Sequence, residues 1–332
     1  MTTIVSDNSI PLTLAVASKP TTGSSAWGET LVFDFSSQVP QGGSVLAYGV
    51  GLAGFNFNYV TNGQVDQNFG LMQNTLIPVQ MENVINVTVA ASIADFDNDA
   101  PADFGSVSNS ETYTQVTVVA LIGQTNTNVV MGNIYGVSGG SAANGVLPVQ
   151  IGSNSTNNVF LSGFQVQTAS PGVLTGFSAS CNLAGPPQNG QLNLSTSTWV
   201  GDRAISGSVD ALVLSFPSSG NDAPANYEIV YPSSISWDSP NSEYGYITGT
   251  FSVSFSKAVT NAAVLLQDFS MSFSDNESWD FCTSGVITSL SWSDGSEVVN
   301  GTITINFFAS EAWYDNYPSS NSSATIAVIA QF

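Results

Sequence analysis

The chain has 332 residues, of which only 8% are charged. It contains 24 acidic and three basic side chains, so the net charge is -21. Nucleic acids and anionic membrane surfaces are therefore poor partners, because binding to phosphate needs several cations. The chain has no histidine, so catalysis that depends on an imidazole is excluded, and with only two cysteines a zinc site is nearly excluded as well.

The first apolar segment, residues 10–16, alternates apolar and polar residues as a β-strand does. Its apolar members are Ile10, Leu12, Leu14 and Val16. Pro11 has no N–H for a central ladder, which favours a sheet edge or an exposed arm within about residues 1–28. Such an arm could add itself to the sheet of a neighbouring molecule. The alternative is an ordinary first strand that pairs within its own module.

A short motif occurs three times along the chain. Its copies are Leu52–Phe57, Leu161–Val166 and Leu266–Met271. Each copy is followed by an alternating apolar run that ends in an aromatic residue beside acidic or amide groups, and then by a further strand pattern. A repeat of about a hundred residues has the usual size of a domain, so the pattern indicates an internal triplication.

Strand patterns dominate between clusters of Gly, Asn, Asp and Pro, and good helix formers are scarce. We therefore predict an all-β protein with almost no helix. It consists of three tandem antiparallel β-sandwich modules of jelly-roll or immunoglobulin-like type. The predicted modules are residues 1–123 with the N-terminal arm, 124–218, and 219–332, the last being rich in aromatic residues.

The densest acidic stretch begins at Asp95 and continues through Asp97, Asp99 and Asp103. Carboxylates at alternate positions are hard oxygen ligands of the kind that calcium prefers. The stretch departs from an EF-hand loop, since Ala100 stands where the turn glycine belongs. Calcium is the one cofactor that the sequence indicates, and a solvated turn between strands is the alternative.

Aromatic residues gather in the third module, interleaved with Asp, Asn and Ser. Those considered for a site are Trp279, Trp292, Trp313, Tyr314 and Tyr317. Aromatic faces beside amides and carboxylates suit sugar rings, but such residues also fill cores and contacts between subunits. Six Asn-x-Ser/Thr sequences also occur, starting at Asn86, Asn154, Asn193, Asn276, Asn300 and Asn321. In a chain this rich in Asn, Ser and Thr many such sequences arise by chance.

The N-terminal residues lack the basic and long apolar parts of a secretory signal, and no run of about 18 apolar residues would span a bilayer. We expect an extracellular protein or one on the surface of a cell or virion, and intracellular assembly stays open. The leading hypothesis is a non-enzymatic structural protein that associates with copies of itself into a filament, layer or virion. The alternative is a glycan-binding or adhesive protein that uses the aromatic residues of the third module.

Overall fold

The computed structural model describes residues 10–21, 27–58, 69–95, 113–125, 129–139, 143–147, 155–168, 175–187, 191–201, 205–217, 224–241, 245–273, 281–311, 314–316 and 321–332. Within these ranges the chain forms antiparallel β-strands, and the only helical element is a short 3-10 turn, Ser36–Gln38. The prediction of an all-β protein with almost no helix is therefore confirmed for the described residues.

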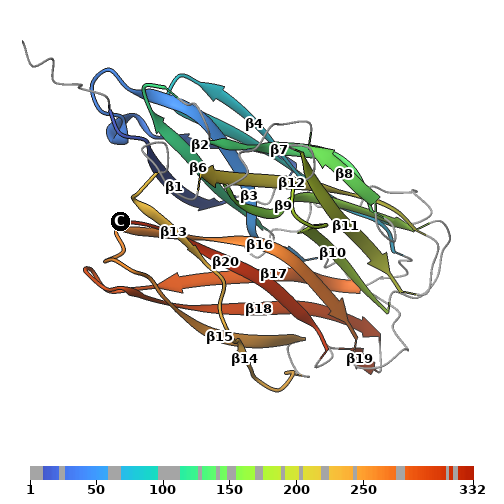
Figure 1. The fold of residues 1–332 in the computed structure, drawn as a ribbon. Coiled ribbons are helices and arrows are strands. Elements are labelled where there is room, and N and C mark those ends of the chain that lie inside the picture. The colour runs from blue at the N-terminus through green and yellow to red at the C-terminus, as the bar shows by residue number, and fades with distance from the viewer. Residues whose placement is uncertain are drawn as a thin grey trace, which may run out of the picture.

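The strands form three sheets, which we call A, B and C (Figure 1). Sheet A has the order β1 (Thr13–Pro20), β6 (Tyr113–Gly123), β3 (Ser44–Asn58), β17 (Phe281–Ser291), β18 (Val298–Glu311), β15 (Tyr246–Ser254) and β14 (Ser236–Trp237), and β19 (Tyr314–Asn316) also pairs with β18. Sheet B has the order β2 (Trp27–Asp34), β5 (Val84–Asp95), β4 (Phe69–Met81), β9 (Ser155–Thr168), β12 (Ile205–Pro217) and β7 (Val130–Gly139). Sheet C has the order β13 (Tyr227–Val230), β20 (Ser323–Gln331), β16 (Asn261–Ser272), β10 (Gly176–Leu183), β11 (Leu192–Val200) and β8 (Ala143–Leu147).

Each sheet joins strands from two of the three predicted modules. Sheet A combines residues 1–123 with 219–332, sheet B combines 1–123 with 124–218, and sheet C combines 124–218 with 219–332. The joints are the pairings β3 with β17, β4 with β9, and β10 with β16. The sheets therefore continue across the predicted boundaries. Alternation in the sequence indicates which face of a strand is buried, but it carries no information about which strand pairs with it.

The three copies of the repeated motif occupy corresponding strands, β3, β9 and β16, and their phenylalanines meet. Ring centroids are 5.1 Å apart for Phe55 and Phe164, 5.1 Å for Phe55 and Phe269, and 5.2 Å for Phe164 and Phe269. All three side chains are buried in one apolar cluster that contains residues from every predicted module. The core is therefore continuous through the three segments.

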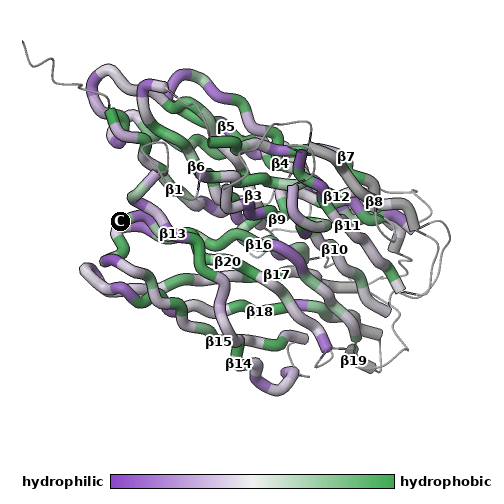
Figure 2. Tube along the Cα trace, in the orientation of Figure 1, coloured by the Kyte–Doolittle hydropathy of each residue, from purple (hydrophilic) through white to green (hydrophobic). Residues whose placement is uncertain are grey.

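A second apolar cluster lies on the other face of the strands that close each repeat. It includes Val119 of β6, Leu212 of β12 and Ile329 of β20. Strands β6 and β20 are consequently buried on both faces and read as nearly continuous apolar runs, which appear green in Figure 2. These strands bring the three segments together.

Amide side chains satisfy backbone groups where sheets meet. The amide of Asn226 accepts a hydrogen bond from the N–H of Leu14 and donates one to the carbonyl oxygen of Leu14, both at 2.8 Å. Asn133 does the same for Val50, at 3.1 and 2.6 Å. Backbone groups at such corners have no strand partner, and leaving them unpaired would be costly. Part of the amide content of the chain therefore serves internal bonding rather than the surface.

Candidate functional site

The N-terminal segment forms an edge strand of its own chain. Strand β1 pairs with β6, with Leu14 opposite Leu121, and the side chains of Leu12, Leu14 and Val16 are buried. Ile10, which precedes the strand, is half-buried. The amide of Asn226 covers part of the outer edge of β1. The structure thus has the pairing of an ordinary first strand in this molecule.

The acidic stretch lies largely outside the described residues. Asp95 ends strand β5, where it pairs with Phe69, and the structure describes only its backbone. Asp97, Asp99 and Asp103 fall outside the described ranges. Elsewhere in the described residues, no three Cys, Asp or Glu side chains come together as a metal site. Calcium binding at this stretch stays a prediction.

Of the five aromatic residues considered, the structure describes the side chain of one. Trp292 follows β17, is half-buried against the core, and lines a small groove of about 180 Å³ together with Ser18, Gln115 and Leu290. Tyr314 lies in β19, where only its backbone is described. Trp279, Trp313 and Tyr317 fall outside the described residues.

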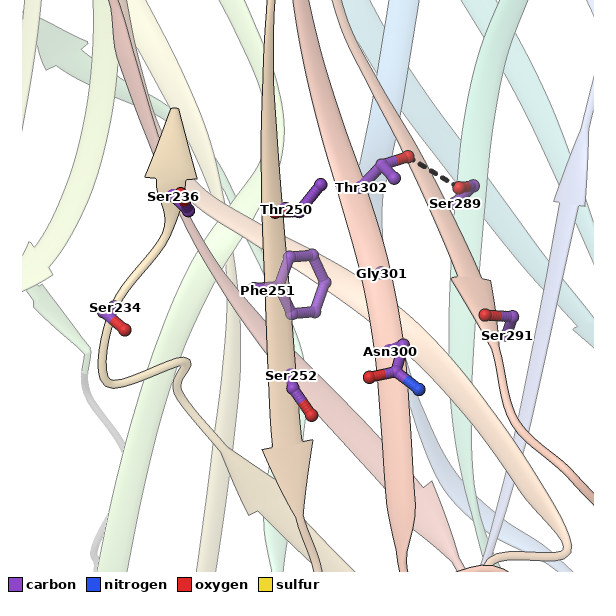
Figure 3. Close-up of a pocket in the computed structure, with 10 residues that line it drawn as sticks. All are labelled: Ser234, Ser236, Thr250, Phe251, Ser252, Ser289, Ser291, Asn300, Gly301 and Thr302. Carbon is purple, nitrogen blue, oxygen red and sulfur yellow. Dashed lines mark hydrogen bonds between the residues drawn. The ribbon is translucent and has the colours of Figure 1, made fainter. Parts of the chain in front are cut away.

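A hydroxyl-lined cleft lies on the outer face of sheet A, over β14, β15, β17 and β18 (Figure 3). Its volume is about 540 Å³. Its lining residues are Ser234, Ser236, Thr250, Phe251, Ser252, Ser289, Ser291, Asn300, Gly301 and Thr302. We call the outer face of these four strands the hydroxyl face. The sequence offered no direct signal for it, because its strands come from separate stretches between residues 234 and 302.

Strand register arranges the hydroxyl face in straight rows. One row runs across four strands, from Ser236 to Thr250, Thr302 and Ser289. The hydroxyls of Ser289 and Thr302 are 2.8 Å apart, and Figure 3 shows this bond. The next row is Ser252, Asn300 and Ser291. Neighbouring strands lie about 4.8 Å apart, so the face is a regular array of short polar groups.

The floor of the cleft is held from the inner side of the sheet. Strand β15 alternates buried and exposed residues, so Phe251 faces the core while its neighbours Thr250 and Ser252 face out. The ring of Phe251 lies across Gly301, where a Cβ atom would collide with it. Glycine at this position therefore lets an aromatic ring cover the inner side of the strand.

The cleft is electrically neutral. No ionisable side chain is among its lining residues, although the chain has a net charge of -21. General acid–base chemistry needs a titratable group near its operating pH, so these residues have no means to move a proton. Their hydroxyl and amide groups can both donate and accept hydrogen bonds, so the face is suited to a neutral, polar partner.

The hydroxyl face has counterparts on the other two sheets. Asn86, Asn193 and Asn300 follow one another at intervals of 107 residues, and each begins an Asn-x-Ser/Thr sequence. They occupy matching places: Asn86 lies opposite Val79 of β4 and Asn300 opposite Ser291 of β17. The carbonyl of Asn193 accepts the N–H of the residue that follows β10. The sequons were visible in the sequence, but their equivalence became visible only with the strand register.

The three equivalent faces differ in chemistry. On sheet C, the hydroxyls of Ser180 and Ser197 bond at 2.7 Å, as those of Ser289 and Thr302 do on sheet A. On sheet B, apolar side chains point outward instead. Val32 is 49% exposed, and on β4 the residues Ile77, Val79 and Met81 are 50%, 55% and 62% exposed. We call this group, with the intervening part of β5, the apolar face.

A third surface feature is a groove of about 460 Å³ between β3, β4 and β7. Tyr48, Tyr135, Met131 and Pro78 are among its lining residues. Burial, the charge of Asp210 and the neighbouring Tyr48 raise the pKa of Tyr135 to about 12, so its hydroxyl stays protonated and can donate a hydrogen bond. The aromatic pattern of the third predicted module gave no signal for this groove, because Tyr48 and Tyr135 lie in the first and second predicted modules.

Comparison with known proteins gave no relative: no family model, no curated protein and no solved structure matches the chain. Among the described residues, no helix has the length and apolar character needed to cross a membrane.

Proposed function

We propose that this protein is a non-enzymatic structural protein that associates with copies of itself, on the surface of a cell or virion, and that the hydroxyl face is one of its contacts. The observation that carries the proposal is the neutrality of this face in a strongly acidic molecule. Two copies repel each other wherever their carboxylates approach. A face that lacks charge is the place where like-charged copies meet at the lowest electrostatic cost.

The chemistry of the face also suits a second copy. Each Ser or Thr hydroxyl both donates and accepts, so the same row can bond to itself when two copies face each other across a two-fold axis. Short side chains let two sheet faces approach more closely than the usual spacing of about 10 Å, so hydroxyls from both sides can come within hydrogen-bonding distance. This contact leaves β1 in place, so it requires no strand exchange.

We also propose that the three segments are copies of one β-sandwich unit. Two observations support this: the corresponding phenylalanines meet in the core, and the Asn-x-Ser/Thr sequences recur at corresponding places. The sheets of the three copies are continuous in one chain. A single chain therefore presents three related outer faces that can differ in side chains.

The decisive experiment places a charge at the centre of the hydroxyl face. Thr302→Glu puts a carboxylate in the four-hydroxyl row, whereas the matched control Thr302→Ser keeps the hydroxyl. We expect sedimentation velocity and negative-stain microscopy to show assemblies for the wild type and the control. The charged variant, if its melting temperature is unchanged, should lose the contact. A wild-type protein that stays monomeric at high concentration, with salt and calcium present, contradicts the proposal.

The second candidate function is glycan binding, and the groove lined by Tyr48 and Tyr135 favours it. Its volume lies within the range of about 300–1,000 Å³ usual for ligand sites, and two aromatic side chains can stack on sugar rings. A glycan array tests this directly. Saturable binding that is lost in Tyr135→Ala but kept in Trp292→Ala would locate the site in this groove. Loss only in Trp292→Ala would favour the aromatic residues of the third module, and no binding on a broad array contradicts both.

A further inference from the structure

The apolar face of sheet B is an unusual surface for this molecule. Of the eight large apolar side chains that are most exposed among the described residues, four lie on it: Val32, Ile77, Val79 and Met81. Register places Val32 and Val79 on either side of Asn86, and Ile77 beside Thr88. The four side chains therefore form one patch rather than scattered exposures. Patches of this kind mark interaction sites more often than single exposed residues do.

Comparison with the hydroxyl face shows whether the fold requires apolar residues at these positions. Ile77 corresponds to Ser289 of the hydroxyl face, and Val79 corresponds to Ser291, because the two strands pair in the same way with β5 and β18. The central asparagine and hydroxyl are the same on both faces, as Asn86 with Thr88 and as Asn300 with Thr302. Only the flanking positions change from hydroxyl to apolar. The fold itself therefore does not require apolar residues at these positions.

The strand pairing across this face is also regular. The pairing of β2 with β5 has its one register shift at Trp27, and the pairing of β4 with β5 has its one shift at Phe69, both away from the patch. The outward side chains stand in straight rows over three strands. Such a surface matches another sheet face better than a helix or a loop, because packed sheets interdigitate row by row.

Charge at the margin of the patch favours a second copy as the occupant. Lys19, one of only three cations in the chain, donates to the carbonyl of Val32 and lies 5.3 Å from the ring centroid of Phe33. Asp34 is exposed two residues after Val32, and its pKa lies below the usual range because Ser36 donates hydrogen bonds to it and Lys19 is near. The two charges lie at the same margin, so a two-fold axis that runs between them would set the amine of one copy against the carboxylate of the other, twice.

We infer that the apolar face is a second self-association site, in which the patch of one molecule packs on the same patch of another. This inference rests on the proposed function, because it adds a second contact to the one proposed on the hydroxyl face. The two faces lie on different sheets, sheet B and sheet A. One two-fold contact gives only a dimer, whereas two different two-fold contacts link copies into a continuing chain when their axes do not meet. Because the two faces lie on different sheets, we expect a linear polymer rather than a closed dimer.

The size of the patch sets the strength of the contact. Three strands by about six residues cover roughly 14 by 20 Å, or about 300 Å² on each copy. Stable interfaces bury about 1,200 Å² or more in total. The contact alone is therefore weak, and assembly depends strongly on protein concentration. Experiments on this contact should therefore be done at high protein concentration.

The test uses one charged variant for each face and a double variant that carries both substitutions. Val79→Glu changes the apolar face at an exposed side chain, and Thr302→Glu changes the hydroxyl face. Trp199→Glu, 41% exposed on β11 of sheet C, is the matched control for loss of an exposed apolar side chain. Sedimentation velocity and negative-stain microscopy measure the assembly state. Circular dichroism and thermal melting verify that each variant is folded.

We expect polymers for the wild type and for Trp199→Glu, dimers for each single variant at high concentration, and monomers for the double variant. The protein concentration needed for polymers should rise at least about tenfold in Val79→Glu. Polymers that persist unchanged in Val79→Glu overturn the inference and leave the proposed function standing. Unchanged polymers in Thr302→Glu alone instead contradict the proposed function at its own face.

Two further outcomes overturn the inference on the apolar face. A wild type that forms only dimers, which Thr302→Glu dissociates, leaves no contact for the patch. An intact mass of the protein from its native source that shows a glycan on Asn86 would also overturn it, because the glycan would occupy the centre of the patch.

Discussion

The meeting of three phenylalanines predicts that the three segments unfold together. Phe269 contacts Phe55, Phe164 and Phe177, with ring centroids 5.1 to 5.3 Å apart, and its side chain is 1% exposed. Replacing a buried Phe with Ala costs about 3–5 kcal/mol, and the loss of three aromatic partners places this position at the upper end of that range. We therefore expect Phe269→Ala to lower the free energy of unfolding by about 5 kcal/mol.

This cost converts into a melting temperature. Unfolding entropy is about 2.1 cal/mol/K per residue, so the 332-residue chain has about 0.7 kcal/mol/K, and 5 kcal/mol corresponds to about 7 °C. Differential scanning calorimetry should show one transition that moves as a whole. Phe332→Ala, at the half-buried C-terminal residue, is the matched control and should move it far less. Three separate transitions, with only one lowered by Phe269→Ala, would refute the reasoning that the sheets couple the segments.

Three other predictions follow from single side chains. Asn226→Ala should cost about 2–4 kcal/mol in urea unfolding and speed amide exchange at Leu14, because both backbone groups of Leu14 lose their partner. Burial raises the pKa of Asp210 above its usual value although the N–H of Gly136 donates to it. The folded state therefore holds the proton more tightly than the unfolded state, and stability falls as pH rises from the usual pKa of Asp through the raised pKa. Asp210→Asn should therefore raise the melting temperature at pH 7, and the gain should shrink toward pH 4; an equal gain at both pH values would contradict this. Burial raises the pKa of the Cys181 thiol to about 12, so maleimide should modify it only after unfolding, as peptide mapping can show.

The sequence was sufficient to predict the all-β class of the fold, but not the pairing of strands. Alternation and turn residues are local, so they indicate strands reliably. The pairing of β3 with β17 joins residues more than two hundred positions apart, and no local pattern reports it. For the same reason the hydroxyl face could not be found, since its rows exist only after four strands have paired.

The apolar face shows how a local pattern can mislead. Ile77, Val79 and Met81 alternate with Pro78 and Gln80, which on its own indicates a strand whose apolar side is buried. The structure exposes these three residues. In the first half of β4 the side chains of Met72 and Leu76 face the core. The pairing of Asn74 with the buried Phe164 fixes that orientation for the whole strand. A strand has only two faces, so the apolar residues after Leu76 must point outward.

On the proposal that the three segments are copies of one unit, their fusion in one chain allows their outer faces to differ, and this matters for assembly. In a trimer of identical chains, any contact face would appear three times, so each trimer would bind three neighbours and the assembly would branch. In this chain the positions occupied by Ser289 and Ser291 on one face are occupied by Ile77 and Val79 on another, so each contact occurs once. Two unlike contacts per molecule give an unbranched chain when their axes do not meet. Changing Ser289 and Ser291 to the apolar residues of sheet B should therefore alter the polymer, because a molecule with two apolar faces can pair either face with either face of its neighbour. Electron microscopy of that double variant should show filaments of irregular geometry, and filaments identical to the wild type would mean that the difference between the faces does not direct assembly.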